Sequence, residues 1–174
     1  MKKFYSILAF IGMISLTSCT VEETTVVDNG YDSDTISEVW EYTNVDFYSG
    51  NNYNVFLDFP HSIYTSDMVL VYRLAGSSSA GDVWKLLPEV YYFDDGTVDF
   101  GYDNDFTTYD AQVSMFGYEL ATLEDVYKFD QVIRVVVIPA YFGNKTSAQV
   151  DYKDYNAVIK HFGIKDKSIV KIAM

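Results

Sequence analysis

The feature that most constrains the fold is an alternation of apolar and polar side chains that recurs from about residue 40 to residue 138. Alternation with a period of two places every second side chain on one face of a β-strand, so that one face is buried and the other meets water. Six or seven such runs follow one another, and one late segment changes to a helical period. The pattern predicts an all-β fold: an antiparallel β-sandwich of about seven strands with one C-terminal helix.

Individual runs give the expected strands and their boundaries. The first run changes phase between Tyr42 and Val45, which indicates a β-bulge. Two runs are apolar on both faces except at Arg73 and Arg134, so we expect them at the centre of a sheet, where neither face meets water. The expected strands span 40–47, 53–59, 68–74, 109–115, 131–138 and 168–172.

Asp95-Gly96 is the clearest turn signal, because these residue types accept the positive φ angles of a two-residue type I′ loop. Such a loop pairs Phe93 with Val98 and Glu89 with Tyr102. The buried face of this hairpin and of the next strand is then aromatic, at Tyr91, Phe93, Phe100 and Tyr109. The opposite face is wet, and it carries Tyr92, Asp94, Thr97, Asp99, Gly101, Asp103 and Asp105.

Near the C-terminus the apolar period becomes that of a helix, across residues 155–162. Asp154 before this segment favours a helix start, and Gly163 after it suits a left-handed C-terminal cap. A shorter helical turn is expected from Thr122 to Asp125, which together resemble a capping box. The sequence thus predicts one clear helix behind a series of strands.

Residues 1–18 have the features of an export signal. Lys2 and Lys3 precede an apolar stretch that is shorter than the roughly 20 residues needed to span a membrane. The following Leu16-Thr17-Ser18-Cys19 resembles a bacterial lipobox, with Leu three positions before the cysteine and small residues between. This resemblance implies a lipoprotein signal peptide that is cut before Cys19, and a diacylglycerol on the Cys19 sulfur. A second acylation, on the new amino group, would make the anchor stable.

Residues 19–36 are expected to form a lipidated, acidic and flexible tether to a sandwich domain at 37–174. Glu22 and Glu23 follow the cysteine closely and resemble the signal that sends some lipoproteins to the outer face of the outer membrane. The sequence therefore predicts a protein that is lipid-anchored at the outer membrane through Cys19. Exposure at the cell surface is a further hypothesis.

Structural motifs in the domain resemble those of a family. The motifs are Val69-Leu-Val-Tyr-Arg73, Trp84 with Leu87-Pro88, and Val135-Val-Val-Ile-Pro139. They resemble the β-sandwich domain of small Gram-negative envelope lipoproteins, some of which have a collagen-like spacer; here the spacer is acidic and lacks that repeat. The resemblance covers roughly residues 37 to 173 and implies a sandwich on a tether, with no site residues to transfer.

Charge and cysteine content exclude several classes of protein. The net charge is −13, and it becomes −15 when Lys2 and Lys3 leave with the signal peptide, which argues against binding to nucleic acid. Cys19 is the only cysteine, so the domain has no disulfide and depends on its core. Residues 19–150 carry 22 acidic and 5 basic side chains, whereas residues 151–174 carry 3 and 5. The C-terminal segment is therefore mildly basic.

Residues suited to catalysis are scarce. Cys19 is assigned to the lipid, and the two histidines, His61 and His161, fall in an expected turn and at an expected helix end. The chain lacks the Gly-x-Ser-x-Gly and His-Glu-x-x-His motifs. Two carboxylates about 5 to 9 Å apart suffice for glycoside hydrolysis, so a carboxylate-pair hydrolase stays open as an alternative.

Two sets of side chains are candidates for ligand binding. Asp103 and Asp105 offer oxygen ligands for calcium, but a regular strand holds such neighbours about 6.6 Å apart, so only a bend would bring them together. No other cofactor is expected. Aromatic residues make up 17% of the chain, and flat rings on an exposed sheet face can stack on sugars. The candidate glycan-binding residues are Tyr48, Tyr53, Tyr92 and Asp99.

Three functions follow from these observations. The first is a lipid-anchored, non-enzymatic module that supports the envelope or contacts another envelope macromolecule. The second is a surface glycan-binding module, and the third is the carboxylate-pair hydrolase. A flat aromatic platform would favour the second, and a deep cleft with converging carboxylates the third.

Overall fold

The computed structural model describes residues 36–143 and 150–174. The predicted signal peptide, Cys19 and the predicted tether up to residue 35 lie outside the described residues. The described residues belong to one compact unit, which begins at Asp32. Among them, no helix has both the length and the apolar character that crossing a membrane requires.

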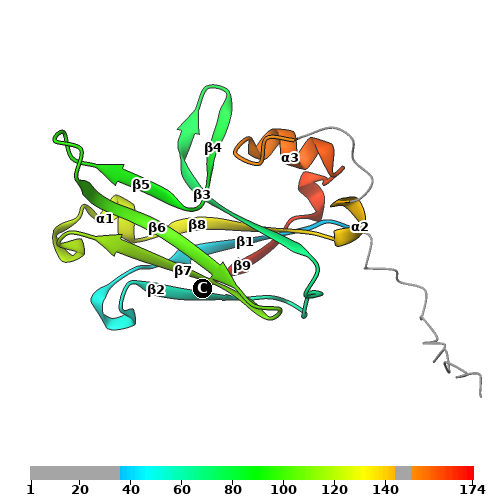
Figure 1. Ribbon diagram of the computed structural model, residues 1–174, viewed down its shortest axis with the longest axis horizontal. Helices are drawn as coiled ribbons and strands as arrows, with labels where there is room; N and C mark the ends of the chain where they lie inside the picture. Colours follow the sequence, from blue (N-terminus) through cyan, green and yellow to red (C-terminus); the bar gives the residue numbers. More distant parts are fainter. Residues whose placement is uncertain (1–35, 144–149) are drawn as a thin grey trace, which may run out of the picture. The chain divides into compact units, whose positions relative to one another are not determined.

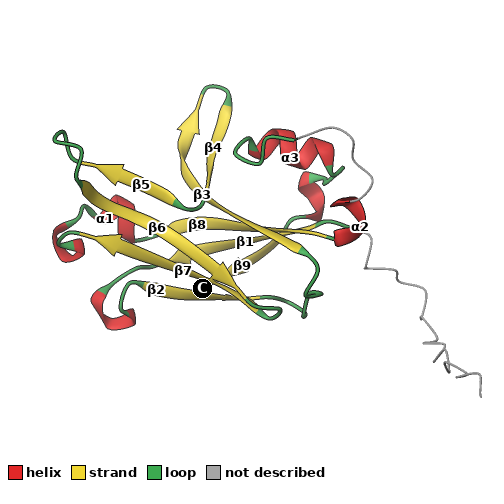
Figure 2. Ribbon diagram, viewed as in Figure 1, coloured by secondary structure: helices red, strands yellow, loops and turns green. Residues whose placement is uncertain are grey.

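Nine strands in two sheets dominate the described chain (Figures 1 and 2). They are β1 (Glu38–Val45), β2 (Asn54–Asp58), β3 (Met68–Ser78), β4 (Gly81–Leu86), β5 (Glu89–Tyr92), β6 (Val98–Phe106), β7 (Asp110–Gly117), β8 (Gln131–Ile138) and β9 (Val170–Ala173). The five-stranded sheet has the order β4-β3-β8-β1-β9, and the four-stranded sheet the order β2-β7-β6-β5. The prediction of an all-β fold with antiparallel sheets is confirmed, with nine strands in place of about seven.

The edge strands of the five-stranded sheet differ most from the expected pattern. β4 was not predicted, because Trp84 is its one buried side chain and only Trp84 and Leu86 alternate within it. β9 was expected from the sequence, and it pairs with β1 in parallel, with Trp40 opposite Val170. This sheet is therefore mixed, because its other strand pairs are antiparallel.

The central strands agree with the prediction. β8 covers the predicted residues 131–138 and lies between β3 and β1. Its side chains and those of β3 from Val69 to Arg73 are buried or half-buried on both faces, which is why neither run alternates. The register of β1 against β8 shifts between Tyr42 and Val45, where the sequence predicted a bulge.

Three short α-helices connect the strands: α1 (Asp125–Lys128), α2 (Ala140–Gly143) and α3 (Tyr155–His161). Single 3-10 turns lie at Ser49–Asn51, Leu120–Thr122 and Asp166–Ser168. α3 is the predicted C-terminal helix, since Asp154 accepts a hydrogen bond from the Ala157 N–H at 3.0 Å and Gly163 has a φ of 66°. The predicted turn at α1 also forms, but the Thr122 hydroxyl donates to the Glu119 carbonyl at 2.9 Å instead of capping the helix.

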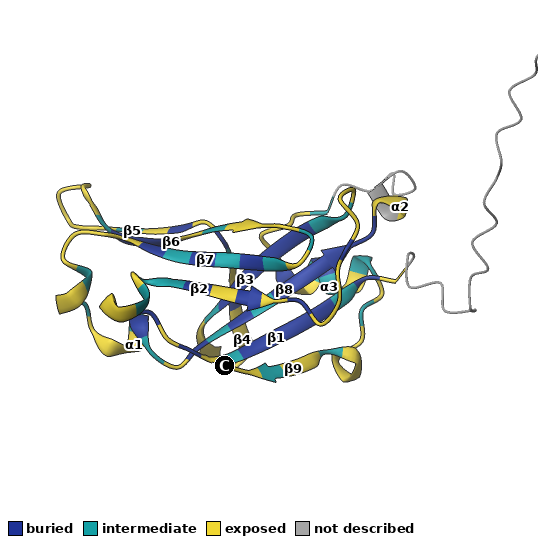
Figure 3. Ribbon diagram, turned by 90° about the horizontal axis from the view of Figure 1, so that it is seen from below, coloured by how far each residue is buried: buried dark blue, intermediate teal, exposed yellow. Residues whose placement is uncertain are grey.

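Apolar clusters on both faces of the five-stranded sheet define three layers. Between the sheets, Trp40 and Val135 of the five-stranded sheet belong to the same cluster as Leu57 and Phe100 of the four-stranded sheet. On the outer face of the five-stranded sheet lies a second cluster, formed by Val39, Leu70, Tyr72, Trp84, Val136 and Ile138 with Tyr155 and Val158 of α3. Figure 3 shows the buried segments, in dark blue, running along both sheets.

The β5–β6 hairpin corrects the expected turn. The Phe93 N–H donates to the Thr97 carbonyl and the Gly96 N–H to the Phe93 carbonyl, both at 2.9 Å, so the loop has three residues. The odd loop shifts the register by one and pairs Tyr92 with Val98; a bulge then restores the expected pairing of Glu89 with Tyr102. Phe93 flanks this loop beyond the end of β5 and its side chain is exposed, so its predicted burial is wrong.

The strand β7 carries a second correction. Ala111, Val113 and Met115 are buried as predicted, but Tyr109 is 70% exposed. Tyr109 precedes the strand and lies in a turn, where its N–H donates to the Thr107 hydroxyl at 3.0 Å. The alternation of β7 does not extend into the turn before it, so that alternation does not predict which way the Tyr109 ring points.

Candidate functional site

The outer face of the four-stranded sheet is the candidate site, because its side chains remain accessible. The outward-facing residues are Asn54, Phe56, Asp58, Val90, Tyr92, Val98, Gly101, Asp103, Asp105, Asp110, Gln112, Ser114 and Phe116, and Asp99 lies in the bulge between Val98 and Gly101. All are exposed or half-exposed except Gly101. The outer face of the other sheet is buried beneath α3, so the two outer faces are not equivalent.

An aromatic platform occupies the β5–β6–β7 part of this face. Gly101 of β6 pairs with Phe116 of β7 on one side and with Val90 of β5 on the other. A Cβ atom at Gly101 would lie 2.5 Å from the Phe116 Cζ atom, so the ring of Phe116 lies over the glycine. Glycine within a strand permits such a close approach. Phe116 is 39% exposed and Val90 is 36% exposed, so apolar side chains flank Gly101 on both neighbouring strands.

Tyr92, one of the predicted glycan-binding residues, lies beside this platform. It lies two residues beyond Val90 on β5, about 6.6 Å along the strand, and is 61% exposed. Asp99 is half-buried on the neighbouring strand, and its carbonyl accepts the Tyr118 N–H at 2.8 Å. The structure therefore places Tyr92 and Asp99 on adjacent strands beside the platform.

Tyr48 and Tyr53 lie apart from Tyr92. Both belong to the β1–β2 loop, which leads into the edge strand β2, whereas β5 forms the other edge of the sheet. Three strand spacings separate these edges, about 14 Å in all. Tyr48 is 48% exposed, but Tyr53 is half-buried against the core. The four predicted glycan-binding residues thus form two groups, and Tyr53 presents little surface.

Asp103 and Asp105, the calcium candidates, lie on the same outer face. β6 continues through them in regular register, with Asp103 opposite Ser114 and Asp105 opposite Gln112. The bend that would bring the two carboxylates together does not form. Among the described residues, no group of three or more His, Cys, Asp or Glu side chains is arranged to hold a metal ion.

The electrostatic character of the face is uniform. None of its outward residues is Lys or Arg, and residues 86–127 as a whole contain 10 acidic side chains and no basic one. The polar atoms between the acids are amides and hydroxyls; the Gln112 Nε2 donates to the Asn54 Oδ1 at 3.0 Å. The face can therefore accept hydrogen bonds from hydroxyl groups, and it would repel a polyanion.

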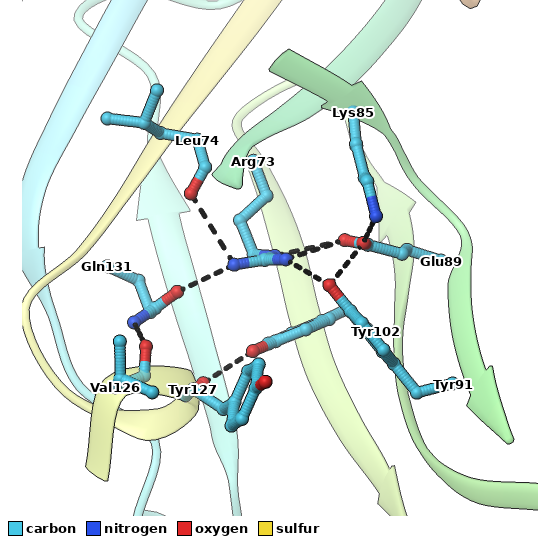
Figure 4. A network of polar contacts seen from close by, with 9 residues as sticks. All are labelled: Arg73, Leu74, Lys85, Glu89, Tyr91, Tyr102, Val126, Tyr127 and Gln131. Atoms are coloured by element: carbon cyan, nitrogen blue, oxygen red, sulfur yellow. Dashed lines mark hydrogen bonds and ion pairs between the residues drawn. The ribbon is translucent and has the colours of Figure 1, made fainter. Parts of the chain in front are cut away.

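A buried ion-pair network lies behind this sheet, between the two layers (Figure 4). The Arg73 guanidinium donates to the Glu89 Oε2 at 3.1 and 2.9 Å, to the Tyr91 hydroxyl at 2.8 Å and to the Gln131 Oε1 at 3.0 Å. It also lies over the ring of Tyr102, 4.5 Å from its centroid. Arg73 and Glu89 therefore join a strand of one sheet to a strand of the other.

The partners of Glu89 hold it in the ionised form. Its Oε1 accepts from Lys85 at 2.7 Å and from the Tyr91 hydroxyl at 2.6 Å. Burial alone would raise the pKa of Glu89, but the hydrogen bonds from Lys85 and Tyr91 and the Arg73 charge outweigh it, and the pKa falls below its ordinary value. A carboxylate held in this way has no proton to donate as a general acid.

A cleft of about 450 Å³ opens beside this network and is lined by Arg73, Tyr91 and residues 125–132 except Lys128. Asp125 and Asp130 are its acidic side chains, and both are exposed. Gln131 connects this network to the backbone around α1, because its Nε2 donates to the Val126 and Phe129 carbonyls at 2.8 and 2.7 Å. The hydrogen bonds of Arg73 and Gln131 are made within the protein, so this cleft offers a ligand few free polar groups.

His61 lies in another cavity, of about 240 Å³, near the start of β1. Its Nε2 is 3.1 Å from the Glu38 Oε2 and its Nδ1 is 3.2 Å from the Ser62 carbonyl oxygen. Burial lowers the pKa of His61, but the Ser62 carbonyl and Glu38 together raise it above its ordinary value. Both ring nitrogens are thus engaged, and His61 is in the expected turn, outside any strand.

Sequence reasoning missed Phe116, Val90 and the Arg73–Glu89 pair. Gly101 was the available signal for Phe116, because glycine inside a strand often marks a close approach of neighbouring groups. Glu89 was placed on the buried face of the hairpin, and an acid there calls for a cationic partner. No family of known proteins matches this chain, and no curated protein or solved structure is significantly similar to it.

Proposed function

We propose that the chain is a lipid-anchored lipoprotein of a bacterial outer membrane whose domain binds a glycan without catalysis. The observation that carries the glycan proposal is the ring of Phe116 lying over Gly101 on an uncovered sheet face, with Val90 and Tyr92 beside it. A flat apolar surface of this kind suits the C–H faces of a sugar ring, and an aromatic ring offers such contact at little cost in conformational entropy.

The polar residues of the same face support a neutral glycan. Carboxylate, amide and hydroxyl groups surround the platform and can accept or donate hydrogen bonds to sugar hydroxyls. Acidic polysaccharides would meet the like charge of Asp99, Asp103 and Asp105, with no Lys or Arg on the face to offset it. The proposed ligand class is therefore an uncharged polysaccharide.

The carboxylate-pair hydrolase receives less support. Glu89 is a buried carboxylate whose partners Arg73 and Tyr91 line the cleft of about 450 Å³, and it is ionised and bound on both oxygens. Glu41, the other buried carboxylate of the described residues, is paired with Arg134 and Lys171. Neither has the free, proton-bearing oxygen that a general acid needs.

Retention on immobilised polysaccharides tests the binding proposal. The chain from residue 19, with Cys19→Ser, would be run through gels that contain a neutral glucan, a neutral mannan or a polyuronate. We expect a neutral polysaccharide to retard it and the polyuronate not to. Tyr92→Ala should weaken the retardation, whereas Tyr109→Ala should not, since Tyr109 is equally accessible but lies at the opposite end of the sheet. Equal migration in all gels would contradict the proposal.

The anchor is tested separately in cells. Growth with a labelled fatty acid should label the full-length protein, and Cys19→Ala should abolish the label. Protease added to intact cells then distinguishes the two sides of the membrane: loss of the domain supports surface exposure, and its survival supports a periplasmic location.

A further inference from the structure

The basic side chains of the domain are concentrated on the side opposite to the proposed glycan face. Segment 160–171, which runs from the last turn of α3 into β9, contains four lysines and one acid, Asp166. The lysines are Lys160, Lys165, Lys167 and Lys171, and all are exposed. Only Lys171 forms an ion pair with a described residue, at 3.0 Å from Glu41. The segment therefore presents a net positive surface on a strongly acidic protein.

The chain enters the domain beside this segment. Ile36, the first described residue, and Ser37 line a cavity of about 330 Å³ together with Phe162, Gly163, Ile164, Lys165 and Ser168. The polypeptide that leads back to Cys19 therefore starts next to the lysines. Ile36 is exposed, so an apolar side chain lies at this entry point and lines the same cavity as Lys165.

We propose that segment 160–171 is a membrane-contact surface that binds anionic lipid headgroups on the side where the tether joins the domain. Lysines near an anionic bilayer each contribute about 1 kcal/mol of attraction. The acidic face of the four-stranded sheet is two layers away, about 20 Å, which exceeds the screening length of about 8 Å at physiological ionic strength. Its repulsion from the bilayer is screened, while the attraction of the lysines is not.

This contact would orient the anchored domain. With segment 160–171 against the membrane, the platform of Phe116 and Tyr92 points away from the lipid, because α3 and the four-stranded sheet lie on opposite faces of the five-stranded sheet. The orientation depends on the proposed anchor at Cys19. The binding itself does not, since the lysines belong to the folded domain.

Co-sedimentation with lipid vesicles tests the proposal on the chain from residue 19 carrying Cys19→Ser, which has no lipid of its own. We expect binding to vesicles of phosphatidylcholine with 30 mol% phosphatidylglycerol at low salt, little binding to pure phosphatidylcholine, and loss of binding at 0.5 M salt. Combined replacement of Lys160, Lys165 and Lys167 by Gln should weaken binding on the order of a hundredfold.

A matched control adds the same charge difference on the other side of the domain: Thr97→Glu, Gln112→Glu and Ser114→Glu together. This variant should bind within about threefold of the unsubstituted chain, because the added charges lie beyond the screening length. Absence of binding to the anionic vesicles, equal binding to neutral ones, or equal loss in the control variant would overturn the proposal. Fatty-acid labelling at Cys19 is unaffected by any of these results, so the two proposals fail independently.

Discussion

The outer faces of the two sheets have opposite roles in the molecule. The five-stranded sheet carries Trp84 and Tyr72 on its outer face, and α3 covers them. The four-stranded sheet carries Phe116 and Tyr92 on its outer face, and both stay accessible. The aromatic side chains of one outer face are thus buried in the core, whereas those of the other outer face are exposed to solvent.

The difference extends to charge. On the covered face, Arg134 donates to the Glu41 Oε2 at 2.8 and 2.6 Å and lies 4.0 Å from the centroid of the Trp84 ring. On the accessible face, the described acids have no Lys or Arg partner. A buried charge needs an oppositely charged partner to offset the loss of hydration, whereas an exposed charge is hydrated and needs none. Substitutions on the covered face should therefore change stability, and those on the accessible face should change binding.

The largest effect is expected from Arg134→Met. Removing the guanidinium leaves Glu41 with only the exposed Lys171 as a cation, and breaking a buried ion pair by removing one partner costs about 3 to 5 kcal/mol. Urea denaturation would measure the free energy of unfolding. Lys171→Ala is the control, because this side chain is 73% exposed and its loss should cost less than about 1 kcal/mol. An equal loss in free energy of unfolding for the two variants would show that the buried Arg134–Glu41 pair contributes no more to stability than the exposed Lys171–Glu41 pair.

A smaller effect is expected from Tyr155→Phe. The Tyr155 hydroxyl accepts a hydrogen bond from the Arg134 Nη1 at 2.8 Å, and the ring contacts Trp84 and Tyr72. The substitution keeps the ring and leaves one N–H of Arg134 without its acceptor, at a cost of about 1 to 3 kcal/mol. Thermal or urea unfolding would detect this. An unchanged free energy of unfolding would mean that water replaces the hydroxyl.

Acid should destabilise the domain through its two buried carboxylates. Burial raises the pKa of Glu41, but Lys171 and Arg134 lower it by more, and the pKa of Glu89 is lowered likewise by Lys85, Tyr91 and Arg73. A carboxyl whose pKa is lower in the folded chain stabilises the fold above its unfolded pKa, near 4.5, and this stabilisation is lost as the pH falls through the folded value.

We therefore expect the contribution of these two groups to the free energy of unfolding to be constant from pH 7 to about 5.5 and to fall below about pH 4.5. Urea denaturation at a series of pH values would measure it. The fall should be shallower in Arg134→Met, because Glu41 then keeps Lys171 but loses the hydrogen bonds and the charge of Arg134, which also lower its pKa. Identical slopes in the two proteins would contradict this assignment.

Most of the fold could be predicted from the sequence, because the local signals and the burial pattern agree. The run at 131–138 is apolar on both faces, and it became the strand that is buried on both faces. The bulge between Tyr42 and Val45 was visible as a change of phase. The helix at Tyr155–His161 had both its N-terminal acid and its C-terminal glycine. Each of these signals lies within about ten residues of the structure it determines.

The candidate site was less predictable because it depends on register and on distant pairs. Phe116 meets Gly101 only through the pairing of β6 with β7, and Glu41 meets Arg134 across 93 positions of the chain. The burial of Phe93 was predicted wrongly because β5 ends at Tyr92, so Phe93 flanks the three-residue loop and its ring lies beyond the sheet. Tyr92 was placed correctly on the accessible face, because its side follows from alternation with Tyr91, which packs against the core.

The affinity of Phe116→Ala for the neutral polysaccharide that best retards the unsubstituted chain tests the difference between the two faces most directly. Phe116 lies at the centre of the platform, so its removal should weaken binding by more than tenfold, the scale of a central aromatic contact. Since the ring is already 39% exposed, the free energy of unfolding should change by less than about 1.5 kcal/mol. Unchanged affinity in a folded Phe116→Ala protein would contradict the account.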